Sequence, residues 1–160
     1  MMRKLLFLLA FAFATLLQAA DFVTESRWIT ASEGDVNAQN TWIAFRKDIT
    51  LGSIPMKVEA SIAAASKYWL WINGEMVVFE GQLKRGPTPK DTYYDKVDIT
   101  PFLKKGNNEV AVLLWYFGKS GFSHNSSGKS GLLFSAQAIG LYSDSQWMSR
   151  IHPAYGTCGD

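Results

Sequence analysis

The sequence has very little cysteine and histidine. Cys158 is the only cysteine among 160 residues, so no disulfide can form within the chain. The two histidines, His124 and His152, lie far apart, and neither has a second histidine or a cysteine at the spacing of a zinc site. These shortages argue against a disulfide scaffold, a catalytic cysteine and a zinc centre.

The one long apolar run lies at the N-terminus. Arg3 and Lys4 precede residues 5–17, where Thr15 alone interrupts the apolar side chains. About 13 such residues behind two positive charges are typical of a signal peptide and fall short of the roughly 20 that a membrane span needs. We expect residues 1–20 to be cleaved and the protein to be exported to the periplasm or the cell exterior.

The rest of the chain has no excess of either charge. Residues 1–20 contain two of the sixteen basic residues and none of the fourteen acidic ones, so cleavage leaves fourteen of each. A formally neutral chain offers no electrostatic footprint to phosphate backbones or anionic lipids. We therefore expect no nucleic-acid partner and, after cleavage, no membrane partner.

Long helical periodicity is also absent beyond residue 40. Apolar residues alternate there over short runs between Gly, Pro, Asn and Asp, which is the pattern of strands and tight turns. Residues 41–49 predict a strand with Ile43 and Phe45 on its apolar face and Arg46 and Asp48 on the other. A second strand is predicted to have one solvent-facing side and an apolar face formed by Met56, Val58, Ala60, Ile62 and Ala64.

The strongest local signal predicts a hairpin at residues 68–79. Asn73 and Gly74 at its centre readily adopt the positive φ angles that a type I′ turn requires. A second turn is expected within residues 98–108, where Thr100 would cap one helical turn that begins with proline.

Residues 109–117 form the most apolar segment, because apolar side chains occupy both faces of the expected strand. We therefore expect a central strand that is covered on both faces. Many short strands without long helices favour an all-β fold, an antiparallel β-sandwich. The sandwich is expected at residues 41–142, after an N-terminal extension at 21–40, and residues 143–160 are expected to begin a linker or a truncated following segment.

Four segments carry a resemblance to a known family: residues 42–50, 65–74, 93–112 and 143–147. In this order and spacing they resemble the N-terminal accessory domains of bacterial α-L-rhamnosidase-like glycoside hydrolases. Such domains are jelly rolls of the galactose-binding-domain-like type. The resemblance covers roughly residues 40–155.

The resemblance implies a non-catalytic accessory module whose polypeptide normally continues into a catalytic α/α-barrel. Its implied partners are that missing catalytic domain and a carbohydrate such as an L-rhamnose-containing glycan. Some galactose-binding-like folds hold calcium through backbone carbonyls and an aspartate, but the sequence assigns no metal ligand and no other cofactor. Two alternatives stay open: a stand-alone carbohydrate-binding protein, and a structural or adhesive sandwich that binds another protein.

The acidic residues include no recognisable catalytic pair. Glycoside hydrolysis needs two carboxyl groups about 5 to 10 Å apart across the scissile bond. Asp95 and Asp98 are the pair to test, but three residues apart on a strand they point to opposite faces. We expect no catalytic residue in this chain, and we expect Asp98 to steady the turn before Pro101.

Aromatic side chains are the candidates for carbohydrate contact. Trp69 and Trp71 share one face of the strand at residues 68–72, and the opposite face should enter the core. An exposed indole can stack on the C–H face of a pyranose ring, but packing within the sandwich or against another domain explains the same residues.

A second candidate site lies where Trp115 and Tyr116 meet the long polar loop that follows them. In that loop, His124 and Asn125 offer hydrogen bonds to vicinal hydroxyl groups. Tyr93 is a further candidate at the edge of the sheet, where core packing and ligand contact are equally consistent with the sequence.

Overall fold

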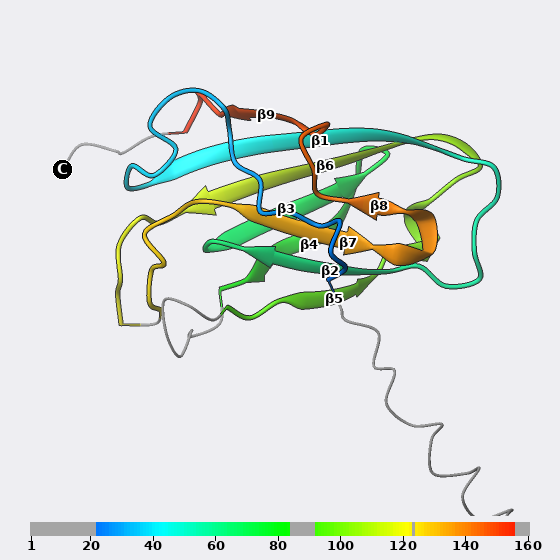
Figure 1. Cartoon of the computed structure of the whole chain (residues 1–160), viewed down its shortest axis with the longest axis horizontal. Coiled ribbons are helices and arrows are strands. Elements are labelled where there is room, and N and C mark those ends of the chain that lie inside the picture. The colour runs from blue at the N-terminus through cyan, green and yellow to red at the C-terminus, as the bar shows by residue number, and fades with distance from the viewer. Residues whose placement is uncertain (1–21, 84–91, 123, 156–160) are drawn as a thin grey trace, which may run out of the picture.

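The structure is a computed structural model that describes residues 22–83, 92–122 and 124–155. The expected signal peptide at residues 1–20 and Cys158 lie outside the described residues. Within them, the chain forms a sandwich of two antiparallel sheets with five and four strands (Figure 1), which confirms the predicted all-β fold. The described ranges contain no α-helix and no helix that is long and apolar enough to cross a membrane.

The strands range from two residues in β8 to eleven residues in β1 and β6. In chain order they are β1 (Thr41–Leu51), β2 (Glu59–Ala64), β3 (Lys67–Ile72), β4 (Glu75–Gln82), β5 (Asp95–Asp98), β6 (Gly106–Tyr116), β7 (Leu132–Ala136), β8 (Leu141–Tyr142) and β9 (Met148–Ile151). Two single turns of 3-10 helix are η1 (Thr100–Phe102) and η2 (Gln137–Ile139). The five-stranded sheet has the order β4-β3-β6-β1-β9, and the four-stranded sheet has the order β5-β2-β7-β8.

The core lies between the sheets and takes every second residue of the strands. In β6, Val110, Val112 and Leu114 are buried, whereas Ala111 and Leu113 on the other face stay partly exposed. This strand pairs with β1 on one side and with β3 on the other, so it is central, as predicted. The expectation of full cover on both faces is wrong, because only the face toward the second sheet is fully packed.

The β3–β4 hairpin turns at Asn73 and Gly74, whose φ angles of 53° and 83° confirm the expected turn geometry. The Asn73 side chain also fastens the turn to its surroundings. Its Nδ2 donates to the carbonyl oxygen of Phe102 at 2.8 Å and to Oδ1 of Asn108 at 2.9 Å. The hairpin end is thereby joined to η1 and to the start of β6.

Two details differ from the predictions. Strand β2 begins after Met56, which is fully exposed. The face of β2 that was expected to be exposed to solvent instead buries Ser61 and Ala63, because these side chains are small and β2 is flanked by β5 and β7. The helical turn also begins one residue earlier than expected: Thr100 is its first residue, because the Asp98 carboxylate accepts the hydrogen bond of its backbone N–H.

The segments on either side of residues 41–142 also contact the sandwich. In the segment assigned to an N-terminal extension, Ile29 forms an isolated β-bridge with Leu132. In the segment from residue 143 onward, β9 pairs with β1 and Trp147 is buried in the core. Both segments therefore contribute backbone pairing or core side chains.

Candidate functional site

Asp95 and Asp98, the pair tested as a hydrolytic dyad, both have structural partners. Oδ2 of Asp95 accepts hydrogen bonds from the Tyr68 hydroxyl at 3.1 Å and from the Gln82 backbone N–H at 2.6 Å. Oδ1 of Asp98 accepts from the backbone N–H and the hydroxyl of Thr100 at 3.0 and 2.6 Å. These bonds lower the pKa of Asp98, which is the opposite of what a general acid needs, and they confirm its role in steadying the turn.

The Tyr68–Asp95 bond instead closes the sandwich along one edge. Tyr68 extends from β3 of one sheet, and Asp95 lies on β5 of the other. Burial and the nearby carboxylate raise the pKa of the Tyr68 hydroxyl. Gly81 packs on the same ring, where a Cβ atom would lie 2.4 Å from Cζ. This edge is structural.

Four of the six tryptophans lie on the outer face of the five-stranded sheet, the face turned away from the core. Trp42 on β1 pairs directly with Trp115 on β6. Trp69 and Trp71 on β3 are partly exposed between buried neighbours, as their alternation predicted. Residues paired across neighbouring strands share a face, so these indoles form one surface.

One end of this surface is an aromatic row, which we define as Trp42, Trp69, Trp115 and Tyr155. The Trp42 ring stacks on three others, with centroid separations of 4.8 Å to Trp115, 5.4 Å to Trp69 and 4.4 Å to Tyr155. Nε1 of Trp115 donates to Oδ1 of Asn40 at 2.7 Å, which fixes that ring. Three stacked neighbours leave little of either Trp42 face open to a ligand.

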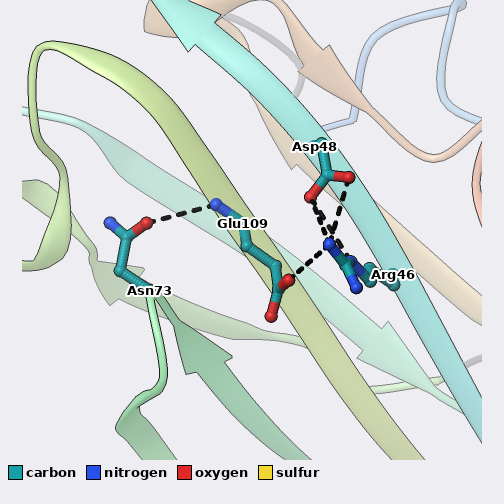
Figure 2. A network of polar contacts seen from close by, with 4 residues as sticks. All are labelled: Arg46, Asp48, Asn73 and Glu109. Carbon is teal, nitrogen blue, oxygen red and sulfur yellow. Dashed lines mark hydrogen bonds and ion pairs between the residues drawn. The ribbon is translucent and has the colours of Figure 1, made fainter.

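The other end of the surface is polar and forms an open groove of about 700 Å³, the Arg46 groove. Figure 2 shows the Arg46 guanidinium between the carboxylates of Asp48 and Glu109. Its Nη2 lies 2.7 Å from Oε2 of Glu109 and 3.3 Å from Oδ1 of Asp48. The backbone N–H of Glu109 donates to Oδ1 of Asn73 at 3.2 Å, so the hairpin turn steadies the strand that carries this carboxylate.

The groove has a balanced charge and mixed hydrogen-bonding groups. Lys104 and Asn107 line it together with Arg46, Asp48 and Glu109, so that two cationic and two anionic side chains face one another. Donors and acceptors that alternate in this way suit a ligand whose groups both donate and accept, as hydroxyl groups do. The side chains of the cluster are about half exposed, so their ion pairs contribute little to stability.

The residues of the second predicted site differ in their burial. Trp115 belongs to the outer face, but its neighbour Tyr116 points into the core and is 1% exposed. His124 is buried as well, at 9% exposure, whereas Asn125 and Tyr93 are exposed. Phe117 lies between Trp115 and His124, with ring-centroid separations of 4.5 Å and 5.0 Å. Ligand binding by these residues, and by the separate candidate Tyr93, stays a prediction.

Sequence reasoning missed Trp42, Asp48, Glu109 and Arg46 as site residues. A usable signal existed in β1, because Trp42, Arg46 and Asp48 share the parity opposite to the core residue Phe45. No such signal placed Glu109 beside Arg46, because that contact depends on the register between β1 and β6, in which Asp48 pairs with Glu109.

No group of three or more His, Cys, Asp or Glu side chains within the described ranges is placed to hold a metal ion. A calcium site stays a prediction of the family resemblance, with no residue assigned to it.

The chain is similar in structure to parts of two rhamnosidases and of a lectin. It is similar to part of a GH78 family rhamnosidase of Bacillus sp. GL1, with a TM-score of 0.68 and 30% identity over 79% of this chain and 13% of that one. It is also similar to part of an α-L-rhamnosidase from Aspergillus terreus, with a TM-score of 0.60 and 25% identity over 81% of this chain and 17% of that one. No protein-family model and no curated protein matches it.

A fungal lectin shares the fold. The lectin from Pleurotus ostreatus, solved in complex with GalNAc, matches 80% of this chain and 36% of its own, with a TM-score of 0.51 and 17% identity, which shows the fold alone. The resemblance predicted from the sequence is thus confirmed: most of this chain matches one β-sandwich segment of α-L-rhamnosidases. The chain spans only a small fraction of the length of those enzymes.

Proposed function

We propose that this chain is a non-catalytic accessory module of an exported α-L-rhamnosidase-like glycoside hydrolase, and that the outer face of its five-stranded sheet contacts carbohydrate. The observation that carries this proposal is the outer face, where partly exposed indoles adjoin a polar groove. Indole rings complement the C–H faces of pyranoses, and mixed donors and acceptors complement their hydroxyls. The similarity to rhamnosidases supports the same ligand class.

Hydrolysis is assigned to the part of such an enzyme that this chain does not match. The matched segment is 13% of the Bacillus enzyme and 17% of the Aspergillus enzyme. Within this chain, Asp95 closes a sheet edge and Asp98 accepts hydrogen bonds from the first residue of a turn, so both carboxylates have other roles. Export is proposed from the apolar run at residues 5–17 that follows two positive charges.

A second function has its own observation: the aromatic row could pack against another domain of the same enzyme. Trp115 and Tyr155 both stack on Trp42, so the row offers a continuous apolar surface more than a single open ring face. Contiguous apolar surface is typical of contacts between proteins. A neighbouring domain is the occupant to expect, since the matched rhamnosidases are much longer than this chain.

Titration calorimetry of residues 21–160 with L-rhamnose and with GalNAc tests the carbohydrate proposal. We expect saturable binding of at least one sugar with a Kd on the order of 1 mM or tighter. No binding heat with either sugar, for a chain whose circular dichroism shows a folded sandwich, would contradict it. The domain-packing function would then predict that the isolated chain self-associates, which light scattering measures.

A further inference from the structure

We infer that the carbohydrate subsite lies over Ala111, between the indole of Trp71 and the Arg46 groove. This inference rests on the proposed function and names the place on the outer face where a sugar ring binds. The aromatic row, although richer in indoles, is not that place.

The strand register brings the two sides of this subsite together. Ala111 on β6 pairs with Trp71 on β3 and with Arg46 on β1. Strands in a sheet are about 4.8 Å apart, so the Trp71 and Arg46 backbones lie roughly 10 Å from each other with only a methyl group between them. Ala111 therefore separates Trp71 from Arg46 on the outer face, and we place the sugar ring over its small side chain.

Trp71 differs from the tryptophans of the aromatic row in having no aromatic neighbour among the described residues. Trp42, by contrast, has three stacked neighbours. Trp71 is partly exposed, and its β4 partner Met76 is 46% exposed. Its ring can therefore stack on a pyranose without first separating from another ring.

Several polar groups of the Arg46 groove make no hydrogen bond within the described residues. Arg46 uses Nε and Nη2 toward Asp48 and Glu109. Nη1 of Arg46 and Oε1 of Glu109 make no hydrogen bond to the described residues, and neither does Nδ2 of Asn107. Two donors and one acceptor of charged or amide type thus remain for the hydroxyls of a ligand.

The charges of the Arg46 groove favour a neutral sugar over an anionic one. Arg46 lies between Asp48 and Glu109, and Lys104 restores formal neutrality to the groove. A phosphate or a uronate would meet two carboxylates beside the guanidinium, which opposes binding of an anion. The ligand we infer is a neutral, polyhydroxylated sugar.

Strand pairing and the hydrogen bonds of the hairpin turn hold the backbone of the subsite. Its residues lie on paired strands, and the hairpin at Asn73 is bonded to Phe102, Asn108 and Glu109. Little ordering is needed on binding, and preorganisation of this kind favours affinity for a small ligand.

Three variants of residues 21–160 test the inference by calorimetric titration with L-rhamnose and GalNAc: Trp71→Ala, Arg46→Ala and Ala111→Leu. We expect each to weaken binding roughly tenfold or more, because stacking, charge-assisted hydrogen bonds or the space over residue 111 is lost. Arg150→Ala is the matched control, because Arg150 is exposed on the same sheet opposite Ala44 and lies outside the groove. The control should bind within about twofold of the unchanged chain.

The outcomes separate the two proposals. Binding of neither sugar by the unchanged chain contradicts the proposed function and this inference with it. Sugar binding that persists in Trp71→Ala and Arg46→Ala, or that is lost equally in Arg150→Ala, overturns the subsite and leaves the proposed function standing. If Trp71→Ala fails to fold, Ala111→Leu and Arg46→Ala decide the same question, because both keep the indole.

Discussion

The two ends of the outer face use tryptophan in different ways. In the aromatic row, Trp42 stacks on three rings and the contacts are made within the protein. Beside the Arg46 groove, Trp71 has no ring partner among the described residues and faces charged side chains across Ala111. The difference shows that indoles on one sheet face can serve two purposes: those that stack on one another stabilise the fold, and one without a ring partner beside polar groups is the better candidate for ligand contact.

Trp42→Ala should give the largest loss of stability among changes to this face. It removes three stacked contacts, each worth about 0.5–1.5 kcal/mol beyond burial, so we expect a fall of about 1.5–4.5 kcal/mol in the free energy of unfolding. Urea unfolding measures it. A loss below about 1 kcal/mol would show that the row does not stabilise the fold.

Trp71→Ala is the matched change at the other end and should destabilise the chain less than Trp42→Ala, because it removes buried apolar area but no stacked ring. The same urea experiment applies. If Trp71→Ala and Trp42→Ala destabilise the chain equally, the distinction between the two ends fails.

Arg46→Ala should change stability by about 0.5 kcal/mol or less, since exposed ion pairs contribute little. Its effect is expected in sugar binding alone. A thermal shift assay that showed strong destabilisation would assign the cluster of Arg46, Asp48 and Glu109 to folding and not to recognition.

Acid should act weakly, through the Asp98 turn at the end of β5 in the four-stranded sheet. Its hydrogen bonds to Thr100 lower the pKa of Asp98 below the ordinary 3.8. A lowered pKa means that the carboxylate stabilises the fold above the unfolded-state value and loses that effect as pH falls through the lowered pKa. Asp98→Asn should therefore flatten the pH dependence of stability below about pH 4, which urea unfolding at several pH values would detect. An unchanged pH profile would contradict this.

The local features could be predicted from the sequence, because they depend on residues that are neighbours along the chain. Alternation in β1 and β3 placed Phe45 inward and Trp71 outward, and Asn73 with Gly74 set the hairpin. Features that depend on pairing between strands distant in the sequence could not be predicted in this way. The subsite over Ala111 needs the registers of β6 with both β1 and β3, and no short-range pattern encodes them.

The burial of individual loop and strand-end residues was equally out of reach. Trp115 and Tyr116 are adjacent and aromatic, yet one lies on the outer face and the other in the core. His124 sits in a polar loop but is 9% exposed, because the loop folds it edge-on against the ring of Phe117 at 5.0 Å. Composition indicates a polar loop but does not say which of its side chains the fold covers.

The most direct test of the account is a nitrogen-15 NMR titration of residues 21–160 with L-rhamnose and GalNAc. We predict that the amides of Ala111, Arg46 and Glu109 and the indole N–H of Trp71 shift with one common dissociation constant, while the indole signals of Trp42 and Trp115 stay nearly unchanged. Shifts confined to the aromatic row or to the loop around His124, or no shifts with either sugar, would contradict it.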